Sequence, residues 1–267
     1  MRLYFLLLLL QSIILAAPNP SQAVEGKDGD AKFTVQKLSR HISIITSNPD
    51  YTNIGYVHGN GANTIIDPGM RPADVVAFLP FLKSVQKDTA AIILNTHNHS
   101  DHTTANEALI KHGARLQTVS SPNIVTYTVT SHASTDRIFH HPTDNIIFIG
   151  DILENGWHPT FYAGGIEGFN KAIGKLLTIS DDKTLFIPGH GHPMSRSALK
   201  AAQENTNKWA KEVERQIAKG RTVTQMMASK RLNAILQTFN TTNRQPFLPE
   251  RAHRRFIERT VALITKQ

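Results

Sequence analysis

Residues 95–102 read Asn-Thr-His-Asn-His-Ser-Asp-His and place four potential metal ligands, His97, His99, Asp101 and His102, within six positions. The stretch follows a continuous apolar run at 90–94 that has the length and composition of a buried strand. In an extended turn, side chains two residues apart point to the same side, so the imidazoles of His97 and His99 can reach one ion. Asp101 and His102 fall where the chain turns into the next helix and can serve a second ion. The alternative, a polar loop with incidental histidines, is disfavoured by the density of ligands.

The strand predicted at 146–149 also ends in a potential ligand, because Gly150 and Asp151 follow it directly. An acidic residue at the end of a buried strand is well placed to bridge two cations. An aspartate in such a position can instead cap the N-terminus of a helix, which is the alternative that involves no metal. The nearby histidines favour the bridging role for Asp151.

The strand predicted at 184–187 ends in the sequence Pro188-Gly189-His190-Gly191-His192-Pro193. Its glycines let the backbone approach other groups closely, and we expect His190, the first histidine beyond the strand, to face the metals. One further ligand is expected from His132, His140 or His141. His132 ends an extended run at 122–131, whereas the other two belong to a strand-like stretch before Pro142.

The composition is that of a globular protein with one large domain or two small ones. The chain has 267 residues, of which 40% are hydrophobic and 19% charged, which excludes a disordered or fibrous protein. It contains no cysteine. That absence excludes a disulfide framework, a thiolate-bound iron–sulfur cluster, a Cys-type zinc finger and a cysteine nucleophile.

Residues 1–23 are predicted to be a signal peptide. Arg2 is followed by an apolar run to Leu15, and the small residues Ser21-Gln22-Ala23 suit cleavage after Ala23. A retained N-terminal anchor is the alternative, although the run is short for a membrane span. We therefore expect a periplasmic or secreted protein that is not an integral membrane protein after cleavage. Export also argues against a nucleic-acid partner.

Positive charge is concentrated at the C-terminal end of the chain. Residues 196–267 carry 15 Lys and Arg against 5 Glu, a net charge of +10, whereas the rest carries 14 basic against 16 acidic residues. A solvated helical face is the ordinary interpretation. The alternative is contact with an acidic partner or surface, such as anionic lipid or a cell-wall polymer.

Short predicted strands alternate with helices along the chain, which indicates a layered α/β or α+β protein. Strands are predicted at 33–35, 41–45, 54–57 and 63–66, with a β-rich stretch at 114–130. Helices are predicted at 72–79, 104–111, 166–177, 196–219, 223–236 and 249–265. We therefore divide the mature chain into a catalytic core at 24–195 and a basic helical segment at 196–267 that packs on the core.

Over roughly residues 40–195 the sequence resembles the metallo-β-lactamase superfamily. The resemblance rests on four motifs: Thr96-His97-x-His99-x-Asp101-His102, Gly150-Asp151, Pro188-Gly189-His190-Gly191 and Ile66-Asp67-Pro68-Gly69. The segment Asn155-Gly156-Trp157-His158-Pro159 is similar to that of a periplasmic hydrolase branch. Two departures are Ser131, where the family usually has glycine, and the short spacing of 29 residues between His102 and His132.

The resemblance implies an α+β fold, a four-layer αββα sandwich with metals at one edge, followed here by a C-terminal helical extension. An ungapped register back from Gly150-Asp151 places His132 on the family's third histidine. The implied first metal site has His97, His99 and His132. The implied second site has Asp101, His102 and His190, with Asp151 bridging the two.

Nitrogen and oxygen ligands without thiolate suit two zinc ions per chain, with iron or manganese as alternatives. Two such ions would share a bridging hydroxide that attacks an ester, thioester, lactone or amide, a β-lactam included, in a small-molecule substrate. Asp101 is the expected catalytic residue, because it can orient the hydroxide and pass a proton to the leaving group. The expected substrate-binding residues, for which ordinary packing is the alternative, are Trp157, His158, Phe161 and Tyr162.

Two other functions remain open on the sequence alone. A mononuclear iron dioxygenase on the same fold would use His97, His132 and Asp151, and would leave the other ligands idle. A diiron oxygen reductase would require glutamate in place of His99. An exported accessory or binding protein with a vestigial metal site would use the basic helical segment to dock a partner.

Overall fold

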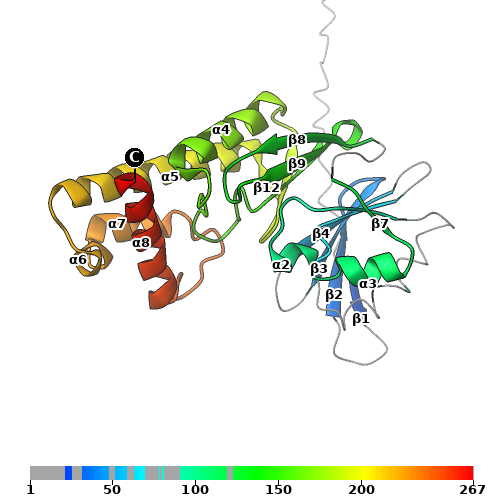
Figure 1. Cartoon of the computed structure of the whole chain (residues 1–267), viewed down its shortest axis with the longest axis horizontal. Helices are drawn as coiled ribbons and strands as arrows, with labels where there is room; N and C mark the ends of the chain where they lie inside the picture. Colours follow the sequence, from blue (N-terminus) through cyan, green and yellow to red (C-terminus); the bar gives the residue numbers. More distant parts are fainter. Residues whose placement is uncertain are drawn as a thin grey trace, which may run out of the picture.

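The computed structural model describes residues 22–25, 32–47, 52–58, 63–69, 78, 80, 91–118 and 123–266, and two β-sheets form the centre of the molecule (Figure 1). The first sheet is antiparallel from β1 to β5 and parallel from β5 to β7. In spatial order its strands are β1 (Gln22–Glu25), β2 (Lys32–Lys37), β3 (Ile42–Ser47), β4 (Thr52–Val57), β5 (Thr64–Ile66), β6 (Ile92–Leu94) and β7 (Arg115–Leu116).

The second sheet is antiparallel except for the parallel pair of β10 and β11. Its strands, in spatial order, are β12 (Met194–Ser195), β11 (Leu185–Pro188), β10 (Ile146–Gly150), β9 (Asp136–His141) and β8 (Val125–Val129). A 3₁₀ turn, η1 (Pro142–Asp144), joins β9 to β10.

Three hydrophobic layers separate four layers of secondary structure. Along β10, Ile146 and Phe148 face the first sheet, while Ile147 and Ile149 face the helices on the other side. Because both faces of this strand are buried, its sequence is continuously apolar. The first sheet is likewise covered on its outer face, where Leu109 of α3 (Asn106–Lys111) packs near Ile93 of β6. This arrangement confirms the predicted αββα sandwich.

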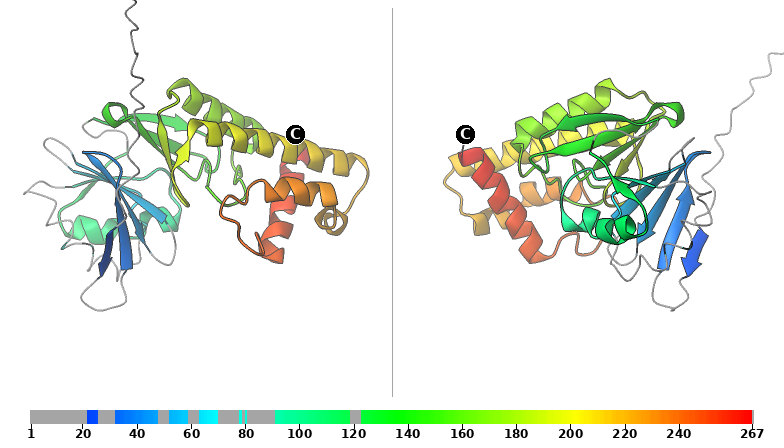
Figure 2. Two further views of the ribbon diagram at one scale, coloured as in Figure 1. Left: turned by 180° about the vertical axis from the view of Figure 1, so that it is seen from behind. Right: turned by 45° about the vertical axis from the view of Figure 1, so that its right-hand side comes forward.

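The C-terminal helices continue the layer that covers the second sheet. The C-terminal helices are α5 (Arg196–Ala218), α6 (Val223–Met227), α7 (Lys230–Gln237) and α8 (Glu250–Thr265). The helices that precede them in the chain are α2 (Ser100–Thr103), α3 and α4 (Gly165–Thr178). Figure 2 shows α6, α7 and α8 at the end of the molecule remote from β1–β3. Trp209 of α5 stacks on Phe256 of α8 at 4.4 Å between ring centroids, and both belong to the hydrophobic cluster that includes Ile147 of β10.

The predicted elements differ from the structure mainly at their ends. The predicted helix at 104–111 is observed as α3, which begins at Asn106, and a separate short helix, α2, precedes it. The predicted helix at 223–236 is interrupted where Ser229 caps α7. The predicted helix at 72–79 lies outside the described residues except for position 78. The predicted signal peptide lies outside them up to position 21, and cleavage after Ala23 would fall within β1. Within the described ranges, the structure contains no helix with the length and apolar character needed to cross a membrane.

Candidate metal centre

The predicted ligands meet where three strands end. His97 and His99 follow β6, Asp151 follows β10, and His190 follows β11. The backbone of β4 holds this edge, because Asn53 N–H donates to the carbonyl of Gly189 at 2.8 Å and Thr52 forms a bridge with His190. Ligands that are far apart in the sequence are therefore fixed to one edge of the two sheets.

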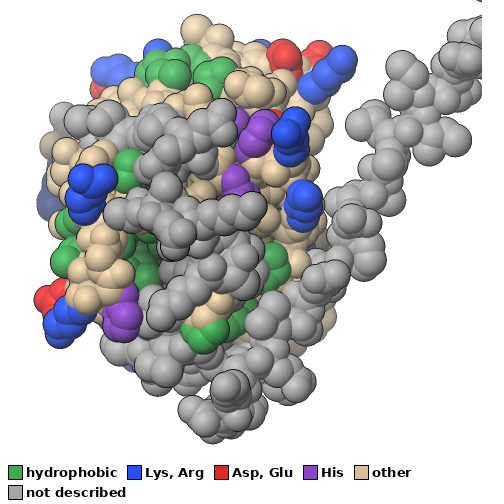
Figure 3. All heavy atoms as spheres, turned by 90° about the vertical axis from the view of Figure 1, so that its right-hand side faces the viewer, with side chains coloured by type: hydrophobic (Ala, Val, Ile, Leu, Met, Phe, Trp, Pro, Cys, Tyr) green, Lys and Arg blue, Asp and Glu red, His purple; other side chains and the backbone are tan. Residues whose placement is uncertain are grey.

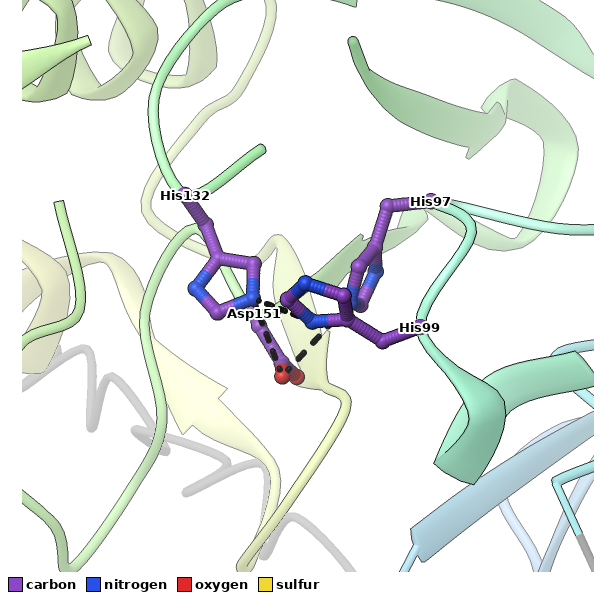
Figure 4. Close-up of side chains that lie close together, drawn as sticks. All are labelled: His97, His99, His132 and Asp151. Carbon is purple, nitrogen blue, oxygen red and sulfur yellow. Dashed lines mark hydrogen bonds and ion pairs between the residues drawn. The ribbon is translucent and has the colours of Figure 1, made fainter. Parts of the chain in front are cut away.

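The first group of ligands contains His97, His99, His132 and Asp151, with one ligand atom from each within 4.8 Å of the others (Figure 4). Nε2 of His132 lies 2.9 Å from Nδ1 of His99 and 3.7 Å from Oδ2 of Asp151. Nε2 of His97 lies 3.8 Å from the same carboxylate oxygen. Three imidazoles and a carboxylate thus surround one space.

The second group contains Asp101, His102, Asp151 and His190 under the same 4.8 Å limit. Nε2 of His190 lies 3.2 Å from Oδ2 of Asp101, and Nε2 of His102 lies 3.3 Å from Oδ1 of Asp151. Asp151 belongs to both groups, so its two carboxylate oxygens can each face a different ion.

The donor atoms of this centre suit divalent cations. Among the described residues, Nε2 of His97, Nε2 of His102 and Oδ1 of Asp151 are buried and make no hydrogen bond. Buried polar atoms without partners are costly, and a cation between them would satisfy them. Imidazole and carboxylate ligands in groups of four match the coordination that zinc prefers.

The electrostatic environment separates the histidines into two kinds. Burial, reinforced by His102, lowers the pKa of His97 to about 3, and burial also lowers the pKa of His132. Burial alone would lower the pKa of His102 as well, but the carboxylates of Asp151 and Asp67 outweigh it and raise that pKa well above its usual value. Neutral His97 and His132 are ready to act as ligands, whereas His102 must release a proton to bind a metal.

His132 is held in place by the segment that follows Asp151. Its Nδ1 lies 3.0 Å from the carbonyl oxygen and 2.8 Å from the hydroxyl of Thr160, which directs Nε2 toward the centre. Asp136 accepts hydrogen bonds from the N–H groups of Ser131 and Ala133 and so closes the loop that carries His132. The alternatives His140 and His141 lie on β9, and neither belongs to a ligand group.

The predicted substrate-binding residues occupy different environments. His158 and Phe161 are buried and pack around Phe256, so for these two the structure shows the packing role. Tyr162 remains partly exposed with its ring 5.9 Å from that of His132. Trp157 lines a hollow of about 460 Å³ beside the second group. Substrate binding therefore stays a prediction that rests on Trp157 and Tyr162.

The hollow also contains residues that the sequence analysis missed. They are Glu154, Asn155 and Arg244, which line the hollow beside the predicted ligand His190. Asn155 donates its backbone N–H to the carbonyl of His190 and its side-chain N–H to that of His192, so it shapes the ligand loop. Burial, reinforced by the charge of Asp151, raises the pKa of Glu154 to about 8. The position of Glu154, three residues after Asp151, could have indicated that it lies near the metal centre. Arg244 has no such signal in the sequence, because only the tertiary fold brings it to the hollow.

Residues 47–114 match the family model described as the metallo-β-lactamase superfamily. A hydroxyacylglutathione hydrolase of Chromohalobacter salexigens is 26% identical over 165 residues, and a probable hydroxyacylglutathione hydrolase of Schizosaccharomyces pombe is 24% identical over 172. These matches cover 54% and 56% of this chain and 62% and 67% of the two relatives.

Similar solved structures include a metallo-β-lactamase of Pseudomonas aeruginosa in a mono-zinc form and one of Pontibacter korlensis. Their TM-scores are 0.57 and 0.55, with 13% and 18% identity. The superpositions cover 66% and 64% of this chain and 95% and 97% of those chains. At these identities the likeness concerns the fold, which is the sandwich described above. The match of residues 47–114, the ligand motifs and the fold are those of the metallo-β-lactamase superfamily.

Proposed function

We propose that this protein is an exported, metal-dependent hydrolase with a dinuclear zinc centre. The observation that carries the proposal is the position of Asp151, which is shared by two groups of ligands whose buried atoms lack partners. A single ion would engage only one of these groups. The substrate class we propose is an ester, thioester, lactone or amide, with a β-lactam included.

Two bound divalent ions would supply an activated water near neutral pH and polarise the oxygen of the bond to be cleaved. Asp101 has its side chain 44% exposed, so it is the ligand-group carboxylate that a substrate can reach. The hydrogen bond from His190 lowers the pKa of Asp101 to about 2, so Asp101 stays ionised and can accept a proton from the attacking water. That proton can then be passed to the leaving group.

The hollow beside His190 is the proposed place for the part of the substrate that lies beyond the cleaved bond. Its wall contains the aromatic ring of Trp157 and the guanidinium of Arg244, which lie 5.8 Å apart. Among the described residues, Arg244 has no acidic partner within ion-pair distance. A substrate with an apolar portion and an anionic group fits this lining.

Export is proposed from the first 23 residues, and it places the activity in the periplasm or outside the cell. The named relatives are hydroxyacylglutathione hydrolases, which makes acyl thioesters the first substrates to try. Export would separate the protein from cytosolic glutathione, so thioesters without glutathione belong in the same panel. Esters, lactones and β-lactams complete it.

A mononuclear iron dioxygenase is less consistent with the geometry, because it would leave Asp101, His102 and His190 assembled without a role. The same assembly argues against a binding protein with a vestigial site. The basic helical segment remains a candidate surface for an acidic partner.

The test is the metal content of the protein purified without chelator or tag, followed by turnover of the substrate panel. We expect two zinc ions per chain, and His132→Ala should lose one of them together with most of the activity. His140→Ala is the matched control and should keep both. A single iron per chain would contradict the proposal and favour the mononuclear iron dioxygenase. A protein that holds no metal after zinc loading would favour the binding protein with a vestigial site.

A further inference from the structure

A second set of histidines lies at the other end of the sandwich. His41 immediately precedes β3 and His58 follows β4, while His141 is the last residue of β9. His141 pairs with Ile146 at the start of β10, whereas the metal centre follows the end of that strand. The three histidines therefore lie one strand length from the metal centre, and they come from both sheets.

These histidines line a common hollow of about 200 Å³, together with Asn123 and Thr143. The rings of His41 and His141 have their centroids 5.9 Å apart. His58 packs edge-on against Tyr56, with 4.5 Å between the ring centroids. Figure 3 shows histidine side chains at the molecular surface beside lysine and arginine side chains.

One carboxylate lies behind two of the three rings. Oδ2 of Asp144 is 3.1 Å from Nδ1 of His41 and 3.5 Å from Nδ1 of His141, and the hydroxyl of Ser39 donates to the same oxygen at 2.7 Å. Nδ1 of His141 accepts the backbone N–H of Asp144 at 3.3 Å. The carboxylate accepts from Nδ1 of His41, which fixes the tautomer of that ring and leaves its Nε2 free. This is the arrangement in which histidine most often binds a transition metal.

We propose that His41, His58 and His141 form a second, mononuclear site for a divalent transition metal such as zinc, with the carboxylate of Asp144 orienting His41. A bound ion would link β3 and β4 of the first sheet to β9 of the second, and so act as a clamp between the sheets. Three imidazoles leave one coordination position for water.

Binding of one ion would require side chains of this set to rotate toward it, because their ring nitrogens do not already converge as those of the main centre do. His141 is buried, whereas the side chain of His41 is 37% exposed and His58 is partly exposed, so these two have room to turn. Burial lowers the pKa of both His58 and His141, which keeps their imidazoles neutral near pH 7 and able to bind. The charges of Lys37 and His41 lower the pKa of His58 further, and the positive charge of Lys37 would oppose a bound cation. The carboxylate of Asp144, which faces His41 and His141, would attract one.

The test counts zinc per chain and compares a double variant with a matched control. After chelator treatment and reloading with excess zinc followed by dialysis, we expect the wild-type protein to hold one ion more than His41→Gln/His58→Gln. The variant His140→Gln changes the neighbouring histidine of β9, which is absent from the hollow, and should bind as many ions as the wild type. Both changed residues of the double variant are partly exposed, so the fold should be retained.

Thermal unfolding gives a second readout. Adding the last equivalent of zinc should raise the Tm of the wild-type protein and of His140→Gln by roughly 5 °C and leave the double variant unchanged. The zinc-dependent increment is the measured quantity, because loss of the His41–Asp144 contact can lower the Tm without any metal. Equal zinc content and equal increments in all three proteins would overturn the proposal. The test measures the difference in zinc content between the wild-type protein and the double variant. Its result therefore does not depend on whether the main centre holds two ions or fewer.

Discussion

Oδ2 of Asp67 lies 3.1 Å from Nδ1 of His102, and the same carboxylate accepts hydrogen bonds from the N–H and the hydroxyl of Thr96 at 2.7 and 2.6 Å. Asp67 is buried and has a φ of 52°, a left-handed conformation that asparagine also tolerates. One side chain thus orients a ligand of the second group and anchors the loop that begins the first.

Asp67→Asn keeps the backbone conformation and removes the charge behind His102. We expect the affinity of the second group for zinc to fall about 10- to 100-fold, because partners of metal-bound histidines have effects of this size. Chelator competition measures the affinity, and kcat/KM should fall with it. Asp182→Asn, at a residue whose side chain is 93% exposed, is the control. An unchanged zinc affinity in Asp67→Asn would show that the contact is incidental.

Gly189 leaves the space that the shared carboxylate occupies. A Cβ at this position would lie 2.2 Å from Oδ1 of Asp151 and 2.6 Å from Cε1 of His102. Gly189→Ala should therefore displace Asp151 and reduce binding at both metal positions. In Gly174→Ala the added Cβ has no heavy atom within 4 Å, and this change in α4 should stabilise the protein by about 1 kcal/mol. Full metal content in Gly189→Ala would contradict the bridging geometry.

The sequence analysis located candidate ligands that the structure brings together, where those residues follow apolar strands. His97, His99, Asp101 and His102 lie close together in the chain, and Asp151 and His190 directly end buried strands. Parallel and adjacent strands bring such ends to one edge, so the strand pattern alone indicates that they meet. The third histidine was ambiguous among three residues, and the structure brings only His132 to the other ligands.

The supporting residues could not be predicted in the same way, because their roles depend on contacts between distant segments. Thr160 reaches His132 across 28 positions, and Asn53 holds the carbonyls of Pro188 and Gly191 across more than 130. Neither residue type signals such a role in a sequence. Arg244 enters the hollow only because the C-terminal helices fold back onto the second sheet.

Arg244 gives a test of the proposed substrate hollow. Arg244→Gln should raise the KM for substrates with an anionic group about 10-fold, since a hydrogen-bonded charge contact has roughly this effect, and should leave kcat nearly unchanged. Neutral substrates should be insensitive. Arg221→Gln is a matched control, because Arg221 is exposed and lies outside the hollow. A fall in kcat with constant KM would instead place Arg244 near the reacting bond.

His158 should make stability depend on pH. Burial lowers its pKa to about 4 in the folded protein, where its ring stacks on Phe256 at 4.3 Å. Above about pH 6.5 the residue is neutral in both states and has no effect. As the pH falls from 6.5 toward 4, only the unfolded chain gains the proton, so the free energy of unfolding decreases.

His158→Phe removes this titration while keeping an aromatic ring against Phe256. Urea unfolding at pH 7.5 and pH 5 should show a smaller loss of stability for the variant than for the wild-type protein. The other histidines affect the wild-type protein and the variant alike. The difference between their losses of unfolding free energy from pH 7.5 to pH 5 therefore measures the contribution of His158. Equal losses would mean that His158 gains its proton while folded.

Trp209 tests whether the helical segment at 196–267 is an independent unit or a part of the core. Its ring is fully buried against Phe256, and Nε1 donates to the hydroxyl of Thr260 at 3.0 Å. Trp209→Ala should reduce the free energy of unfolding by about 3–5 kcal/mol, whereas Trp209→Phe, which keeps the stacking, should lose much less. A chain cut after Ser195 would expose the outer face of the second sheet, and we expect it not to fold. Cooperative unfolding of the chain ending at Ser195, with its metal content intact, would show instead that the helices are a separate domain whose role is to bind a partner.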